Sequence, residues 1–219
     1  MINENVLVVS RQEILPPIGK AFYGISAEAL SPIMDAISKH GFFMDRATAE
    51  HDERFKQIIP YFIFHTDEKL FLMQRAASAN ETRLASKMTL GIGGHIRSED
   101  TKSTPTIFEW GLREFREEVC YAGILDGELL GFINDDTNAV GRVHMGVVFL
   151  VHGDSADISI RSELASGELM NFAQCCSCMS EMESWSSLVM EHLIQRRAKY
   201  GSIAGNRSSE ICSITRVQI

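Results

Sequence analysis

The segment Arg113-Glu114-Phe115-Arg116-Glu117-Glu118 decides how this chain of 219 residues is interpreted. It lies within residues 106 to 120, which form a strongly helical stretch. On a helix, Glu114, Glu117 and Glu118 occupy positions i, i+3 and i+4, so their carboxylates project from one face. Leu112 and Phe115 point away from the acids and are expected to anchor the helix on a sheet. The segment therefore predicts an amphipathic helix with one acidic face.

Such an acidic face suits divalent cations, because clustered carboxylates repel one another and their oxygens are the ligands that Mg²⁺ and Mn²⁺ prefer. Arg113 can pair with Glu117 four residues later, or turn inward to orient Glu114. The alternative is an ordinary solvated helix laced with Arg/Glu pairs. The preceding strand, however, ends in Gly93-Gly94, where a backbone without side chains can approach a ligand closely. Strand, glycine turn, long loop and acidic helix together favour a metal-dependent site.

This arrangement resembles the Nudix hydrolases. The motif of that family has a glycine, a later glutamate, and then Arg-Glu-apolar-any-Glu-Glu-any-Gly-apolar, and its second half stands here at residues 113 to 121. The resemblance implies that Glu117 and Glu118 bind Mg²⁺ or Mn²⁺, that Glu114 is a ligand or the water-activating base, and that Arg113 orients it. It also implies that a glycine carbonyl contributes to the metal site. We assign that role to Gly94, and Gly93 to substrate contact.

Two features depart from the family pattern. The interval from Gly94 to Arg113 is longer than in the family, so the upstream glutamate is either Glu99 or Glu109. Cys120 replaces the usual helix-ending glycine, which removes no ligand. The resemblance covers roughly residues 58 to 195. Flanking residues also look like a little-characterised bacterial Nudix subgroup known as predicted phosphoesterases, and that label supplies no substrate.

The implied reaction is attack of a cation-activated water on one phosphorus of a diphosphate, in a nucleoside diphosphate derivative or a related compound. Glu114 or a downstream acid would take the proton. Glu163 and Glu168 are the candidates for that acid, of which we select Glu163; the alternative is a solvated loop glutamate. His95 and His144 are candidate substrate contacts, although a histidine on a strand is more often a packed, hydrogen-bonded residue.

The rest of the chain predicts an α+β fold, namely a Nudix-like α/β/α sandwich with a mixed β-sheet and an N-terminal α/β extension. We expect an extension at residues 1–57, a hydrolase domain at 58–200 and a tail at 201–219. Ser26 is the expected N-cap of a helix over residues 26–40. The other expected elements are a strand near residues 6–9, a hairpin over 61–75, strands at 143–151, 158–161 and 211–219, and a helix over 183–199.

Composition limits the other possibilities. With 45% hydrophobic residues and a formal net charge of −8, the chain can bury a core, and it lacks the basic surface that nucleic acids and anionic membranes attract. No apolar run approaches the roughly 20 residues of a membrane span, and Met1 does not begin a signal peptide, so we expect a cytoplasmic protein. Five cysteines, an odd and unevenly spaced set, indicate reduced thiols. A homodimer is expected from base rates alone.

Two other functions are compatible with a Nudix fold. One is a non-catalytic module that senses a nucleotide, but a pure sensor has no need of Arg113 and all three acids. The other is isomerisation of an isoprenoid diphosphate. Known isomerases of that kind depart from Arg-Glu in the motif and carry an essential cysteine upstream of it, whereas no cysteine precedes Cys120 here. Hydrolysis is therefore the leading hypothesis.

Overall fold

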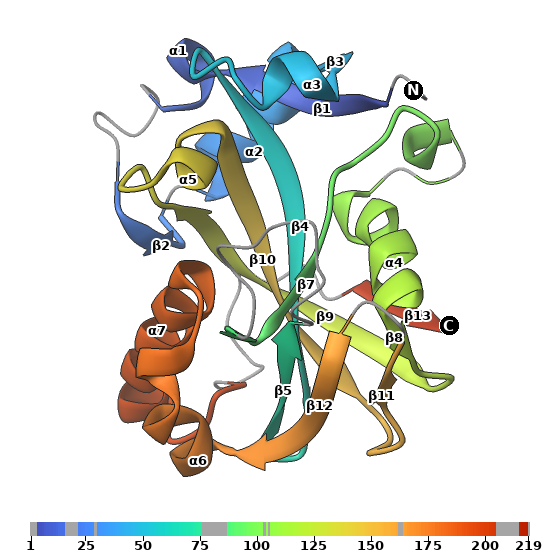
Figure 1. Ribbon diagram of the computed structural model, residues 1–219, viewed down its shortest axis with the longest axis vertical. Helices are drawn as coiled ribbons and strands as arrows, with labels where there is room; N and C mark the ends of the chain where they lie inside the picture. Colours follow the sequence, from blue (N-terminus) through green and yellow to red (C-terminus); the bar gives the residue numbers. More distant parts are fainter. Residues whose placement is uncertain are drawn as a thin grey trace. The chain divides into compact units, whose positions relative to one another are not determined.

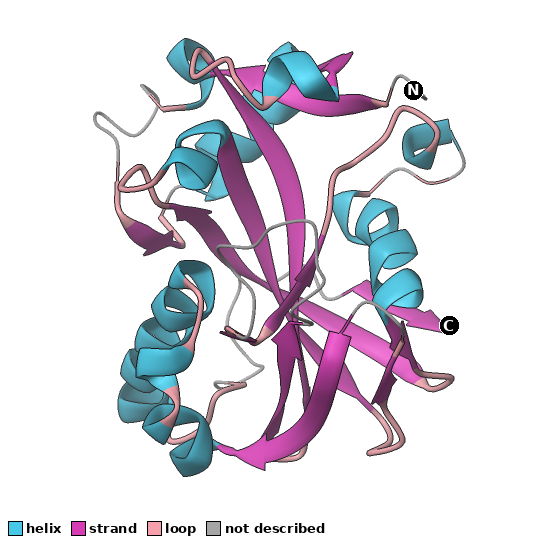
Figure 2. Ribbon diagram, viewed as in Figure 1, coloured by secondary structure: helices cyan, strands magenta, loops and turns pink. Residues whose placement is uncertain are grey.

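The computed structural model describes residues 4–15, 22–28, 30–75, 87–102, 104, 106–161, 164–204 and 215–218. Within these ranges the fold is α+β, as predicted, with strands that pair in the order β12-β5-β4-β10-β9-β13. The chain forms two compact units, and β4 (Phe55–Thr66), β9 (Ile124–Asn134) and β10 (His144–Gly153) contribute residues to both. Helices and strands are interspersed along the described residues (Figure 2).

The first unit comprises residues 1–61, 93–113 and 130–148. Its centre is β1 (Asn5–Ser10), an apolar strand whose four valine and leucine residues are buried. β1 pairs antiparallel with β3 (Phe42–Asp45) and with the start of β4, and α1 (Arg11–Ile14), α2 (Leu30–His40) and α3 (Arg46–Ala49) lie against it (Figure 1). The unit also holds β2 (Gly24–Ser26), a 3-10 turn (Asp100–Lys102) and the whole of α5 (Ala139–Val143). Of α4 (Ile107–Glu118) it holds the residues up to Arg113.

The second unit comprises residues 62–92, 114–129 and 149–219. A tight turn at Asp67, with φ of 50°, joins β4 to β5 (Lys69–Arg75) and makes the predicted hairpin. β5 pairs along its length with β12 (Leu164–Asn171), from which α6 (Phe172–Ser177) continues. The remaining elements are β6 (Met88–Thr89), β7 (Gly91–Gly93), β8 (Val119–Cys120), β11 (Ser159–Ile160), a 3-10 turn (Met179–Glu181), α7 (Ser184–Tyr200) and β13 (Thr215–Gln218).

Two of the predicted helix ends are wrong. Ser26 does not cap a helix, because it ends β2, where Ile25 pairs with Ile133 of β9, and α2 starts at Leu30. Pairing with a distant strand has overridden the local capping pattern. The helix predicted to reach residue 120 ends at Glu118, after which the chain continues as β8. The expected boundaries at residues 57 and 200 stay predictions.

The helix α4 is amphipathic as expected. Phe108, Leu112 and Phe115 are buried and share one face of it. In the second unit the ring of Phe115 packs against Phe62 and Phe64, with centroids 6.1 and 6.3 Å away. These aromatic contacts fix the end of α4 that carries the three acids.

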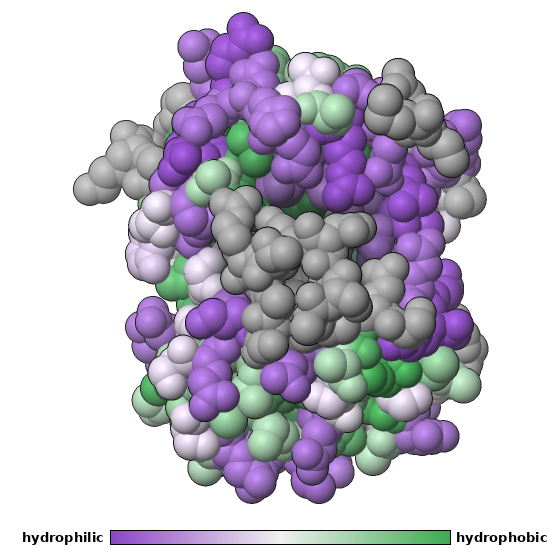
Figure 3. Space-filling view, viewed as in Figure 1, coloured by the Kyte–Doolittle hydropathy of each residue, from purple (hydrophilic) through white to green (hydrophobic). Residues whose placement is uncertain are grey.

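Other expectations concern the surface and the thiols. Hydrophilic residues predominate over the N-terminal elements at the top of Figure 3. Among the described residues, no helix is long and apolar enough to cross a membrane. Cys120, Cys175, Cys176 and Cys178 are free thiols, and Cys212 lies outside the described residues.

Removal of the Phe115 ring should destabilise the protein. Phe115→Ala deletes a side chain that is only 1% exposed and leaves a cavity, so we expect the free energy of unfolding to fall by about 3–5 kcal/mol. Arg116→Ala, at the exposed neighbouring position, is the control and should change it by about 0.5 kcal/mol at most. Chemical denaturation measures both. A loss below about 1 kcal/mol for Phe115→Ala would show that this ring does not anchor α4.

Candidate functional site

The first turn of α4 is held by hydrogen bonds between Thr106 and Glu109. The Thr106 hydroxyl accepts a hydrogen bond from the Glu109 backbone N–H (3.2 Å) and donates one to the Glu109 carboxylate (2.7 Å). Glu109 is therefore occupied in holding the first turn of the helix. Glu99, the other candidate for the upstream glutamate, is exposed and accepts a hydrogen bond from Ser98 (3.1 Å).

The opposite end of α4 carries the three acids. Glu114 and Glu118 are partly buried and Glu117 is exposed. The Glu118 carbonyl accepts a hydrogen bond from the Arg161 N–H (2.8 Å), and the Arg161 side chain donates to the Val119 carbonyl (3.1 Å). A cation at this position suits the negative end of a helix.

The strand β8 follows α4 directly, and for this reason Cys120, two residues past the end of the helix, does not need to be a glycine. Among the described residues, Asp67 is the one non-glycine position with a positive φ, so Cys120 stays out of the left-handed region. A residue in extended β backbone needs no glycine. Cys120 pairs instead with Ser159 of β11.

Arg113 ties the start of the site to the loop that follows the glycines. Its guanidinium donates to both carboxylate oxygens of Asp100 (3.0 and 3.3 Å) and to the backbone carbonyl of His95 (2.9 Å). Asp100 in turn accepts a hydrogen bond from the Arg97 N–H (2.8 Å). Arg113 thus fixes the backbone from His95 to Asp100. Asp100 was not among the predicted residues, because nothing in its local sequence singles it out.

Gly93 has a packing reason to be glycine. A Cβ at this position would lie 2.7 Å from the Pro60 carbonyl oxygen and 2.9 Å from a ring carbon of Tyr61. The end of β7 therefore lies too close to β4 for any side chain. The proposed roles of Gly93 in substrate contact and of Gly94 in metal binding stay predictions beside this structural one.

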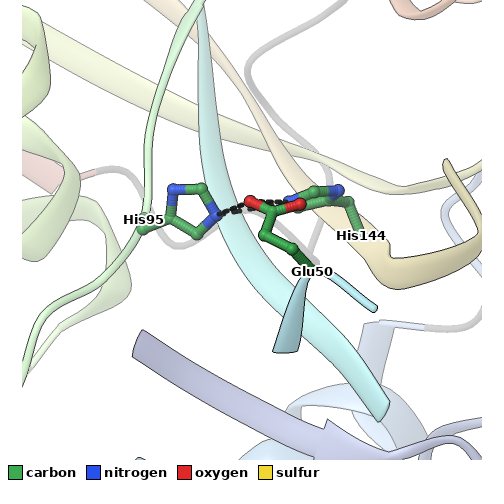
Figure 4. Close-up of side chains that lie close together, drawn as sticks. All are labelled: Glu50, His95 and His144. Carbon is green, nitrogen blue, oxygen red and sulfur yellow. Dashed lines mark hydrogen bonds and ion pairs between the residues drawn. The ribbon is translucent and has the colours of Figure 1, made fainter. Parts of the chain in front are cut away.

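The structure brings the two predicted histidines together with an acid that the sequence did not indicate. The Nε2 atoms of His95 and His144 lie 3.2 Å apart (Figure 4). A carboxylate oxygen of Glu50 lies 3.7 Å from the first and 3.9 Å from the second. Glu50 follows α3, His95 follows the glycine turn and His144 begins β10. All three belong to the first unit.

Both imidazoles of this cluster are neutral near pH 7. Burial, together with the guanidinium of Arg46, lowers the pKa of His95 to about 2. Burial also lowers the pKa of His144 and outweighs the opposing effect of its hydrogen bond to the Val140 carbonyl. Nδ1 of His144 lies 2.8 Å from that carbonyl. Because a carbonyl only accepts, the proton of His144 sits on Nδ1, and its Nε2 carries a lone pair directed at the cluster.

A buried cation holds the backbone of His144. The Lys56 ammonium lies 2.6 Å from the Gly141 carbonyl, 3.2 Å from the His144 carbonyl and 2.7 Å from the Asp136 carboxylate. Burial lowers the pKa of Lys56 to about 8, against the opposing effect of Asp136. Lys56 therefore joins β4 to the end of α5, where His144 begins the next strand.

The remaining predicted acids are less informative. Glu163 lies outside the described residues, and Glu168 is exposed on β12.

Comparison with known proteins gives two similarities that extend over most of the chain. Protein YmaB of Bacillus subtilis (strain 168) is 30% identical over 203 residues, which are 88% of this chain and 98% of that protein. The crystal structure of Tm1382, a candidate Nudix hydrolase, matches with a TM-score of 0.73 and 30% identity. That match covers 88% of this chain and 99% of Tm1382. No profile of a protein family matches the chain.

Loss of the Lys56 charge should weaken the fold around His144. Lys56→Met keeps the apolar stem but removes the buried donor from Asp136 and the two carbonyls, so we expect the free energy of unfolding to fall by about 3 kcal/mol. Lys39→Met is the matched control, because Lys39 is 66% exposed in its pair with Asp35, and it should cost less than about 0.5 kcal/mol. Equal stability of the two variants, measured by urea unfolding, would contradict this role of Lys56.

Proposed function

Because the chain belongs to the Nudix hydrolase family, we propose that it hydrolyses a diphosphate linkage in a nucleoside diphosphate derivative or a related compound, with Mg²⁺ or Mn²⁺ as cofactor. The observation that carries the proposal is the acidic face of α4. Glu117 and Glu118 stand one turn after Glu114, on a helix whose other face is packed into the core.

The residues present fit divalent cations. Glu117 and Glu118 are the proposed ligands, with Glu114 and the Gly94 carbonyl as further oxygen donors, and oxygen donors are what Mg²⁺ and Mn²⁺ require. When bound, the cations would neutralise negative charge on the diphosphate and on the attacking and leaving oxygens. The protein supplies the geometry, because Phe115 anchors the acidic end of the helix in the core.

The chain's own side chains would handle the proton and the substrate. A base must accept the proton of the attacking water, and Glu114 is the proposed base, with Glu163 as the second candidate. Arg113 orients Glu114 in this proposal and also holds the backbone carbonyl of His95. His95, His144 and Gly93 are the proposed substrate contacts. A neutral His95 beside a phosphate would serve as a hydrogen-bond donor rather than as a charge, whereas the Nε2 of His144 can only accept a hydrogen bond or bind a cation.

A substrate panel tests the activity. The protein is incubated with Mg²⁺ or Mn²⁺ and with ADP-ribose, NADH, dinucleoside polyphosphates, nucleotide sugars, CoA and nucleoside triphosphates. We expect metal-dependent release of the two phosphate-containing products from at least one of them. Tight binding of one compound with no turnover of any would support a nucleotide-sensing module instead.

Glu117→Gln should lower the turnover number by about 100-fold or more with little loss of stability, because it removes one charged ligand from an exposed position. Glu191→Gln is the matched control, an exposed glutamate on α7, and should retain full activity. Steady-state kinetics across a range of Mg²⁺ concentrations measures the effect. Unaltered activity of Glu117→Gln would remove the acidic helix from the mechanism.

A further inference from the structure

We propose that Glu50, His95 and His144 form a second metal site, which binds a zinc-class divalent ion through two imidazole nitrogens and one carboxylate oxygen. Their potential ligand atoms all lie within 4.8 Å of one another. The donor set differs from that of the α4 face, which offers carboxylates. A metal site at this position would also give the N-terminal extension, residues 1–57, a chemical role, because that extension supplies Glu50.

The distances suit coordination of a single ion. Two ligands bound at about 2.1 Å in tetrahedral geometry lie about 3.4 Å apart. The separation of the two Nε2 atoms, 3.2 Å, is close to that value. The Glu50 oxygen is 3.7 and 3.9 Å from these nitrogens, so it has to move inward by about half an ångström to reach the same distance. The Glu50 side chain is 34% exposed, and its carboxylate lies beside both imidazoles (Figure 4).

The tautomer of His144 is already set for metal binding. Its Nδ1–H donates to the Val140 carbonyl, which leaves the Nε2 lone pair directed at His95 and Glu50. Histidines that ligate metals commonly donate their other ring N–H to a carbonyl or carboxylate in this way. The hydrogen bond that orients a metal-binding histidine is therefore present on His144.

All three backbones are also held in place. The His95 carbonyl accepts a hydrogen bond from Arg113 (2.9 Å), and the His144 carbonyl accepts one from Lys56 (3.2 Å). The Glu50 N–H, just after the end of α3, donates to the carbonyl of Arg46, the first residue of that helix (3.0 Å). A ligand set on such fixed backbone loses little conformational freedom when an ion binds.

The charges around the cluster set its selectivity. The Arg46 guanidinium lies 3.6 Å from the Glu50 carboxylate. The positive charges of Arg97 and Arg113 also act on His95 and help to lower its pKa. These positive charges oppose the binding of any metal ion, so the affinity of the site has to come from the imidazole lone pairs rather than from charge. Neutral imidazoles bind zinc-class ions well through their lone pairs, whereas Mg²⁺ prefers oxygen. Three protein ligands leave a fourth tetrahedral position for water or for a ligand.

The competing explanation is a simple hydrogen bond. If the proton of His95 sits on Nε2, it can be donated to the lone pair of His144, and the pair is then satisfied without an ion. The two explanations differ in where that proton lies once metal is supplied.

The test is metal binding by the full chain carrying Glu117→Gln and Glu118→Gln, which weakens the carboxylate site. Zn²⁺ is titrated by calorimetry, and Co²⁺ is followed by visible absorption, which reports tetrahedral nitrogen coordination. We expect one equivalent of each ion to bind. His95→Gln should weaken binding by about 100-fold and Glu50→Gln by about 10-fold, because each removes one ligand. His40→Gln, at an exposed histidine paired with Glu13, is the control and should bind as before.

Long-range ¹H–¹⁵N spectra of the histidine rings give a second measurement, which does not depend on the stability of the variants. Saturating Zn²⁺ should remove any proton from the Nε2 atoms of both His95 and His144. Retention of a proton on His95 Nε2 at saturating Zn²⁺ would overturn the proposal in favour of the hydrogen bond. Absence of stoichiometric Zn²⁺ binding, or equal binding by His95→Gln and the parent protein, would overturn it as well. Loss of catalysis in Glu117→Gln with Zn²⁺ binding intact would separate the two sites.

Discussion

The proposed site depends on the amphipathic character of α4, because one face of this helix must be buried while the other carries three acids. The apolar face of α4 is buried through Phe108, Leu112 and Phe115, and the aromatic packing around Phe115 leaves that helix end little freedom to rotate. The acids at positions 114, 117 and 118 must therefore project from the other side. Hydrophobic burial supplies the stability of this helix end.

The features that the sequence predicted are those encoded over a few residues. The α4 helix follows from apolar spacing and from its acids, and the β4–β5 hairpin follows from two apolar runs around a polar turn. Burial of Leu112 and Phe115 was expected for the same reason. The family assignment rested on six consecutive residues, and the similarity to Tm1382 over most of the chain supports it.

The features that the sequence missed depend on pairing between distant segments. β9 interrupts its apolar residues with glycines, and Gly131, at φ of 153°, lies where a Cβ would meet the Ser26 carbonyl oxygen at 2.6 Å. Periodicity therefore fails there, although the strand is an integral part of the sheet. The acid Glu50 is similar, because it stands in a mixed, charged stretch and meets two histidines that are themselves 49 residues apart. Lys56 follows a charged stretch and precedes Gln57, so its local sequence gives no sign of burial, and only the fold reveals its three oxygen partners.

In the proposed mechanism the acidic face of α4 binds the catalytic cations. Anomalous diffraction from crystals soaked in Mn²⁺ tests it most directly, because the ion is located without reference to any assumed substrate. We expect an anomalous peak about 2.2 Å from carboxylate oxygens of Glu117 and Glu118. A map with no peak beside either glutamate at saturating Mn²⁺ would contradict it.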